Sequence, residues 1–259
     1  MQIKKHTSKF FLFLLPLVLL IQTKGSFAEE IDLTQSPFYS QKRYSQHREE
    51  DIIRHFFKDE KNGVFVDVGA SDYQKFNNTY YLEKNLNWSG VAIDALSQYA
   101  DDYKKYRPKT KFFTYYVSNR SDGMQKFFKA KINEVSSGVR QWMKAVAPRV
   151  MMNWKKDEEM PYEEIEVPRI TLNKLLSENK IDKVDMVNMD IELSEPEALA
   201  GFDIKKYRPR LVCIETQAPV RKWIMNYFAN NGYEPIAEYL PYDNANTYFR
   251  PKPTQPAAA

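Results

Sequence analysis

The feature that most constrains the fold is a series of short apolar runs, each separated from the next by a segment with helical spacing. The runs are rich in β-branched residues and bounded by turn residues, which is typical of buried strands. Strands that alternate with helices in this way predict a mostly parallel α/β sheet. The predicted strands cover residues 64–68, 90–94, 111–117, 184–190 and 211–215, with closing strands at 233–240 and 246–250. The predicted helices cover residues 49–57, 77–86, 98–106, 171–176, 195–200 and 220–231.

Residues 124–165 interrupt this alternation. They begin with a strand candidate at 124–130 and continue with Trp142 and Trp154 among charged residues. We interpret them as an insertion over one rim of the sheet, whose aromatic side chains serve packing or form a lid. The predicted organisation is an N-terminal helical segment at 29–60, an α/β domain at 61–250 that carries the insertion, and a flexible tail at 251–259.

The first 28 residues are typical of a secretory signal peptide. Lysines precede an apolar run from Phe10 to Ile21, and Ser26-Phe27-Ala28 fits a small-x-small cleavage pattern. The run is short for a helix that spans a bilayer, which favours export over a permanent membrane anchor. We therefore expect a periplasmic, secreted or lumenal protein with no stable membrane span after removal of the leader.

Loss of this leader also changes the charge balance. It removes four lysines from 38 basic residues and leaves 34, which equals the 34 acidic residues. A neutral mature chain gives no support for a nucleic-acid partner. The single cysteine, Cys213, cannot form an internal disulfide and is interpreted as a small buried side chain.

Ligands of open parallel sheets bind beyond the carboxyl ends of the strands. The loop after the first predicted strand reads GASDYQ from Gly69 and lacks the GxGxxG fingerprint, and Asp72 would repel a pyrophosphate. Asp94 ends the second strand, 25 residues after Gly69, where an acid can accept both hydroxyls of a ribose. Together these features suit S-adenosylmethionine, although Asp94 could equally cap a helix or a turn.

Several blocks of the chain resemble one protein family. FVDVGASD, NNTYYLE, NWSGVAID, VDMVNMDIELSEPEALAGFD, RPRLVCIE and NTYF, between Val64 and Phe249, are similar to the FkbM family of S-adenosylmethionine-dependent methyltransferases. The resemblance implies a Rossmann-like methyltransferase fold, with a mostly parallel seven-stranded sheet, helices on both faces and an antiparallel last strand. It also implies O-methylation of a hydroxyl on a sugar or polyketide-type acceptor. Tyr73 and Leu193 stand where the family often has glycine, and we expect them to narrow the cofactor loop and the acceptor side.

The resemblance also assigns residues to two roles. Asp190, Glu192 and Glu215 would act on the acceptor as catalytic residues, and no residue is assigned to a metal. The residues that would hold S-adenosylmethionine are Asp67, Gly69, Ala70, Ser71, Asn78, Asp94 and Ser118.

The stretch MDIELSEPE, residues 189–197, divides between these roles and the scaffold. Ser194 and Glu197 have the spacing of a capping box, so Glu195 and Glu197 are interpreted as helix-start residues. Asp190 and Glu192 point the same way if the chain stays extended, and could deprotonate a hydroxyl or hold a hard divalent cation. Alternatively, Asp190 accepts backbone hydrogen bonds and Glu192 pairs with a surface arginine.

Three functions remain open at this point. The leading hypothesis is an O-methyltransferase that acts on a small-molecule or glycan acceptor. The second is an exported domain of the same fold that binds a glycan or protein partner without turnover. The third, a glycosyltransferase that uses a nucleotide sugar, lacks a basic phosphate site. The sequence leaves the oligomeric state undetermined.

Overall fold

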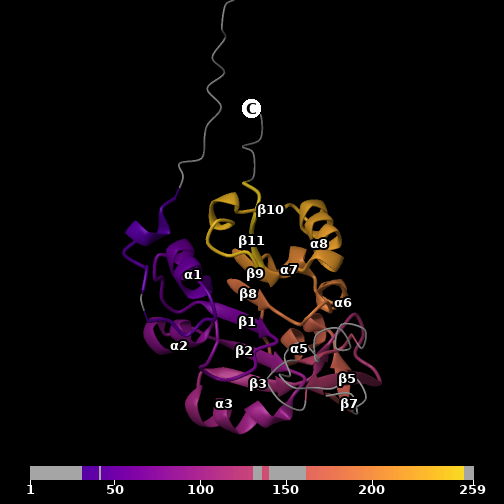
Figure 1. Ribbon diagram of the computed structural model, residues 1–259. Coiled ribbons are helices and arrows are strands. Elements are labelled where there is room, and N and C mark those ends of the chain that lie inside the picture. The colour runs from indigo at the N-terminus through magenta and orange to yellow at the C-terminus, as the bar shows by residue number, and fades with distance from the viewer. Residues whose placement is uncertain (1–30, 41, 131–135, 140–161, 254–259) are drawn as a thin grey trace, which may run out of the picture. The chain divides into compact units, whose positions relative to one another are not determined.

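A seven-stranded sheet forms the centre of the computed structural model, which describes residues 31–40, 42–130, 136–139 and 162–253 (Figure 1). The predicted leader at 1–28, Trp142 and Trp154 lie outside the described residues. Within the described part of the chain, no helix is long and apolar enough to cross a membrane.

The strand order of this sheet is β10-β11-β9-β8-β1-β2-β3. All neighbours pair in parallel except β11, which is antiparallel to both β9 and β10. This confirms the predicted fold class, including the antiparallel last strand. The strands are β1 Val64–Val68, β2 Ser89–Asp94, β3 Thr110–Thr114, β8 Met186–Met189, β9 Leu211–Glu215, β10 Tyr233–Pro235 and β11 Asn246–Pro251.

Helices cover both faces of the sheet (Figure 1). Phe65 of β1 packs against α1 and α2, whereas Val66 and Val68 pack in the core under α5, α6 and α8. This alternation is the period of two that a strand imposes on its side chains. The helices are α1 Glu49–Phe57, α2 Tyr80–Leu86, α3 Ala100–Tyr106, α5 Leu172–Glu178, α6 Glu195–Ala200, α7 Ile204–Tyr207 and α8 Ala218–Asn230, with short 3₁₀ turns η1 Leu33–Gln35, η2 Ser97–Tyr99 and η3 Ala237–Tyr239.

The single strand predicted at 111–117 is wrong, because the chain divides there between two sheets. Residues 110–114 form β3 of the large sheet, and β4 Tyr116–Val117 pairs in parallel with β7 Tyr162–Ile170. A second sheet follows, in the order β4-β7-β5-β6, with β5 Met124–Ala130 and β6 Ser136–Ser137. The strand predicted at 124–130 is thereby confirmed, and the described parts of the insertion add a small sheet beside the large one (Figure 1).

The strand predicted at 233–240 is also only partly present. It ends as β10 at Pro235, and the Ile236 N–H makes one further hydrogen bond to the Tyr248 carbonyl at 2.8 Å. The following residues turn into η3, and Ile236 and Tyr239 are buried against α1. The predicted tail begins later than residue 251, because Pro251 still pairs with Tyr233.

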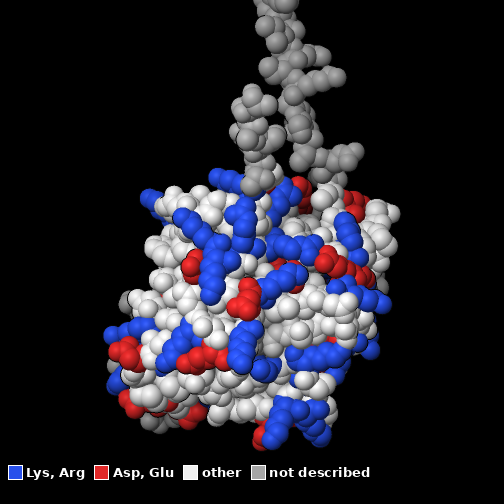
Figure 2. Space-filling view, turned by 180° about the vertical axis from the view of Figure 1, so that it is seen from behind, with Lys and Arg blue, Asp and Glu red and all other residues white. Residues whose placement is uncertain are grey.

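The surface carries charges of both signs. Figure 2 shows Lys and Arg side chains spread over one face with Asp and Glu among them. Several of these charges form exposed ion pairs, such as Arg250 with Glu234 at 2.9 Å.

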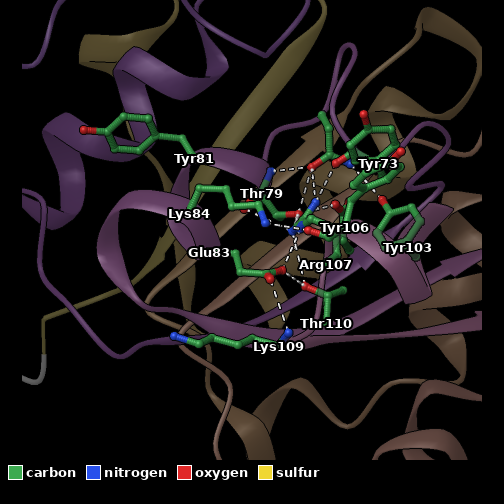
Figure 3. A network of polar contacts seen from close by, with 12 residues as sticks. Tyr73, Thr79, Tyr81, Glu83, Lys84, Tyr103, Tyr106, Arg107, Lys109 and Thr110 are labelled. Carbon is green, nitrogen blue, oxygen red and sulfur yellow. Dashed lines mark hydrogen bonds and ion pairs between the residues drawn. The ribbon is translucent and has the colours of Figure 1, made fainter.

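A buried ion pair connects α2 to the end of α3 (Figure 3). Arg107 is fully buried, and its Nε lies 2.6 Å from Oε2 of Glu83 in α2. Figure 3 shows the Arg107 guanidinium within a network of hydrogen bonds and an ion pair. Its other N–H groups donate to the main-chain oxygens of Tyr73 and Thr79 and to the side chains of Asn77, Thr79 and Thr110.

Replacement of Arg107 should therefore destabilise the protein strongly. We expect Arg107→Met to lower the free energy of unfolding by about 3–5 kcal/mol, because Glu83 would stay buried without a counter-charge. The matched control, Arg250→Met, removes an exposed ion pair and should cost about 0–1 kcal/mol. Urea unfolding measures both values, and equal losses in the two variants would contradict this role of Arg107.

Candidate functional site

A cavity of about 540 Å³ opens at the carboxyl ends of β1, β2 and β8. This is the edge at which parallel sheets bind ligands. Five of the ten predicted site residues line it: Gly69, Ser71, Asp94, Asp190 and Glu192.

Gly69 allows β1 and β8 to approach each other at the base of the cavity. Its φ is +81°, a region that glycine enters without strain. A Cβ atom at this position would lie 1.8 Å from the carbonyl oxygen of Asp190. The Gly69 N–H donates to the carbonyl of Ile93 at 2.8 Å, which joins β2 to the same turn. Only glycine fits this position without displacement of Asp190.

Asp94 both holds a turn and faces the cavity. Its Oδ2 accepts a hydrogen bond from the Ser71 N–H at 3.0 Å, and its Oδ1 accepts one from the Leu96 N–H at 2.8 Å. Burial raises the pKa of Asp94 to about 6, although these backbone donors act in the opposite direction. Each carboxylate oxygen keeps a lone pair for a ligand in the cavity. The turn and ligand interpretations of Asp94 are therefore compatible.

Asp67 does not line the cavity, contrary to its predicted contact with the cofactor. Its side chain leaves β1 on the same face as Phe65, toward α2. There it accepts hydrogen bonds from Thr79 Oγ1 and Asn188 Nδ2, both at 2.8 Å. Asn78 continues this chain by donating to Asn188 at 2.9 Å, and it too is absent from the cavity lining.

Ala70 and Ser118 are likewise outside the cavity lining. The Ala70 carbonyl accepts a hydrogen bond from Asn77 Nδ2 at 3.0 Å, so this residue anchors the loop. The Ser118 hydroxyl is bonded to the main chain of Arg120 and is fully buried. Both residues maintain the walls and offer no group to a ligand.

Four carboxylates gather beside the end of β8: Asp190, Glu192, Glu195 and Glu215. Among the residues that the structure describes, none of the four forms a salt bridge, which excludes the surface arginine considered for Glu192 within that part of the chain. Instead, Gln217 Nε2 donates to Glu192 at 2.6 Å and to both oxygens of Glu215 at 3.0 and 3.1 Å.

The geometry after β8 differs from the extended chain considered for Asp190 and Glu192. Glu192 and Leu193 have φ values of +54° and +74°, so the chain turns through two left-handed residues. This conformation is costly for a side chain such as Leu193, whereas glycine adopts it without strain. The turn still keeps Asp190 and Glu192 in the cavity.

The crowding of these acids changes their protonation. Asp190 is exposed to the cavity, but protein atoms surround it, and this desolvation together with Glu215 raises the pKa of Asp190 well above its ordinary value. Burial and the carboxylates of Glu215 and Asp190 raise the pKa of Glu192 in the same way. Carboxyls with raised pKa values are stronger proton acceptors once ionised and are typical of functional sites.

The predicted capping box is wrong. Ser194 is the N-cap residue of α6, but its side chain makes no capping hydrogen bond. Glu197 instead accepts a hydrogen bond from the Tyr116 hydroxyl at 3.1 Å. Glu195 is fully buried, and its Oε1 accepts a bond from the Ile191 N–H at 3.0 Å. Glu195 therefore belongs to the acidic cluster and is not simply a helix-start residue.

Tyr73 does not narrow the cavity as expected. It is absent from the cavity lining, and its ring stacks on Tyr106 with centroids 4.7 Å apart. Leu193 is also absent from the lining.

Sequence reasoning missed several residues that do line the cavity. Tyr99 and Tyr116 supply aromatic walls, and Phe127 of β5 and Ser136 of β6 reach it from the small sheet. Gln46 comes from the N-terminal segment, which had been assigned to a separate region. Tyr116 was missed because residues 111–117 were predicted as one strand, whereas the chain divides there between two sheets and places Tyr116 at the cavity. Nothing in the sequence marks Gln46.

Comparison with known proteins places these observations in a family. The model described as the methyltransferase FkbM domain matches residues 67–235, more than half of the chain. The chain matches no curated protein. Among solved structures, it is similar to a precorrin-6y C5,15-methyltransferase from Geobacter metallireducens GS-15, with 10% identity, a TM-score of 0.41, and coverage of 82% of this chain and 91% of that chain. The family assignment rests on the domain match.

The close approach at Gly69 gives a matched pair of variants. Gly69→Ala and Gly123→Ala both place a side chain at positive φ, but a Cβ at Gly123 meets nothing within 4 Å. We expect Gly123→Ala to cost about 1–2 kcal/mol of stability from backbone strain alone. Gly69→Ala should cost more, because it also displaces Asp190. Denaturant unfolding measures both losses of stability. Equal losses would contradict the constraint at Gly69, because they would show that the chain accommodates a Cβ beside the Asp190 carbonyl without a further loss of stability.

Proposed function

Because the chain belongs to the FkbM methyltransferase domain family, we propose that it transfers a methyl group from S-adenosylmethionine to a hydroxyl of a sugar or another small polar acceptor. The observation that carries this proposal is Asp94, which faces a cavity at the carboxyl edge of the sheet beside Gly69 and Ser71.

The chemistry of the cavity fits this cofactor. Asp94 offers carboxylate oxygens to the two ribose hydroxyls, and Gly69 and Ser71 leave room for the nucleoside to approach the main chain. S-adenosylmethionine supplies a methyl group on a positively charged sulfonium, which an acidic cavity wall favours. The volume of about 540 Å³ lies within the usual range for small-molecule sites.

A nucleotide sugar fits the same loop poorly. Asp72 Oδ1 accepts hydrogen bonds from the N–H groups of Gln74 and Lys75 at 2.8 and 2.6 Å. These donors are therefore occupied, and the carboxylate itself would repel a diphosphate. This favours a cofactor without phosphates over the glycosyltransferase hypothesis.

The acidic cluster supports a role on the acceptor side. Asp190 and Glu192 line the cavity, and Gln217 connects Glu192 to Glu215. Methyl transfer requires alignment of the acceptor oxygen with the reacting methyl group, and loss of the hydroxyl proton. An ionised carboxylate of Asp190 or Glu192 would orient the hydroxyl and accept that proton.

The second candidate function is a binding domain without turnover. The leader-like sequence at 1–28 favours it, because an exported protein would need a supply of a donor that is made in the cytosol. The left-handed Leu193, where related sequences favour glycine, points the same way. Such a domain would hold a glycan or protein partner, and S-adenosylmethionine binding discriminates between the two proposals.

Replacement of Asp94 tests the cofactor site. We expect full-length protein to bind S-adenosylmethionine in calorimetric titration, and Asp94→Asn to weaken binding by at least about tenfold, because a charged acceptor is lost. Asp102→Asn, at an exposed acid in α3, serves as the control and should leave the affinity unchanged. Unchanged affinity in Asp94→Asn, or no binding by the unaltered chain, would contradict the proposal.

The raised pKa of Asp94 predicts a pH dependence of the same affinity. The carboxylate is ionised above about pH 6 and neutral below it, and only the ionised form accepts both ribose hydroxyls fully. The affinity of the unaltered chain for S-adenosylmethionine should therefore increase as the pH rises from 5 to 7. The affinity of Asp94→Asn should increase by a smaller factor over the same range. Titrations at several pH values measure this difference, and parallel profiles for the two proteins would assign the pH dependence to other groups.

A further inference from the structure

Three of the four carboxylates lie close enough to share one ligand. One oxygen each from Asp190, Glu195 and Glu215 lies within 4.8 Å of the other two. The three come from separate parts of the chain: the end of β8, the start of α6 and the end of β9. Asp190 is exposed to the cavity, Glu195 is buried and Glu215 is half-buried.

Glu195 provides an independent sign that this cluster binds a ligand. Its residue is fully buried, and its Oε1 is held by the Ile191 N–H. Its Oε2 has no hydrogen-bond partner among the residues that the structure describes. Buried carboxylate oxygens without partners are rare because desolvation of the charge is costly. Glu195 also supplies one of the three clustered oxygens, so its unpartnered carboxylate oxygen belongs to a side chain that faces Asp190 and Glu215.

We propose that Asp190, Glu195 and Glu215 bind a hard divalent cation at the acceptor end of the cavity. Mg²⁺, Mn²⁺ and Ca²⁺ prefer such oxygen ligands, and the cluster contains no nitrogen or sulfur donor. Metal–oxygen distances of about 2.1–2.5 Å place two ligands of one ion at most about 5 Å apart, which the spread of these oxygens satisfies. A divalent cation would also offset most of the charge of three carboxylates that form no salt bridge with the described part of the chain.

The position of the cation gives it a role in the proposed function, on which this step rests. Asp190 lines the cavity, whereas Glu195 and Glu215 lie next to Asp190 but outside the cavity lining. The three protein oxygens would leave coordination positions open toward the cavity for an acceptor hydroxyl. A metal-bound hydroxyl is more acidic than a free one, so Glu192, also in the lining, could accept its proton. Acceptors with two neighbouring oxygens, as in sugars, would bind such an ion as chelates.

Direct cation binding tests the proposal without an assay of methyl transfer. Mn²⁺ is the probe, because the electron paramagnetic resonance signal of the free ion reports how much is bound. We expect full-length protein to bind one Mn²⁺ per chain in the cluster and Glu195→Gln to weaken binding by at least about tenfold. Glu197→Gln, two residues further along α6 and outside the cluster, should bind as the unaltered chain does.

Thermal unfolding supplies a second readout. Mn²⁺ should raise the melting temperature of the unaltered chain and of Glu197→Gln, because it binds only the folded state, but not that of Glu195→Gln. Without Mn²⁺, Glu195→Gln should be at least as stable as the unaltered chain, since it replaces an unpartnered buried carboxylate with a neutral amide. Absence of Mn²⁺ binding by the unaltered chain at millimolar concentration would overturn the proposal, and so would equal binding in Glu195→Gln.

The cation and cofactor proposals can fail separately. Binding of S-adenosylmethionine without binding of Mn²⁺ would overturn the cation site and leave the methyltransferase proposal standing. Mn²⁺ binding that depends on Glu195, without binding of S-adenosylmethionine, would support the cation site and contradict the cofactor site.

Discussion

The close approach of Gly69 to Asp190 is the constraint on which the rest of the site depends. β1 lies between β2 and β8, and its last residues must turn away without separating the ends of its neighbours. Glycine at positive φ permits that turn, with its N–H bonded to Ile93 and its α-carbon against the Asp190 carbonyl. Asp94 at the end of β2 and Asp190 after β8 thereby come to line one cavity.

Two groups of polar residues near this turn differ in how many of their polar atoms have hydrogen-bond partners. One group contains Arg107 and Asp67, and the other is the acidic cluster. Arg107 has an acceptor for each part of its guanidinium, and Asp67 has a donor on each oxygen. Such complete networks fix the loop in one conformation. The acidic cluster instead has four carboxylates, a single amide from Gln217 bridging two of them, and an oxygen of Glu195 without a partner in the described chain. A buried carboxylate oxygen without a partner, beside a cavity that Asp190 and Glu192 line, is the feature that supports a ligand site here.

The sequence predicted most strands of the large sheet and their parallel arrangement, because short β-branched runs that alternate with helices are typical of such sheets. Gly69 and Asp94 were also predictable, since they sit at strand ends where ligands bind. Asp67 was predicted to contact the cofactor, but it lies outside the cavity lining. It is two residues from Phe65 in β1, so both side chains leave the strand on the face that α2 covers. Glu195 was assigned to a helix cap by local spacing, whereas tertiary packing buries it beside Asp190. Arg107 and Gln46 owe their roles to contacts distant in sequence, which no local pattern records.

The cavity between Gly69, Asp94 and Asp190 is the proposed cofactor site of this methyltransferase domain. A crystal structure of the protein grown with S-adenosylhomocysteine tests it most directly. The account predicts density for the nucleoside in this cavity, with the ribose hydroxyls within hydrogen-bonding distance of the Asp94 carboxylate and the sulfur directed toward Asp190. An occupied site elsewhere, or an empty cavity at saturating ligand, would contradict it.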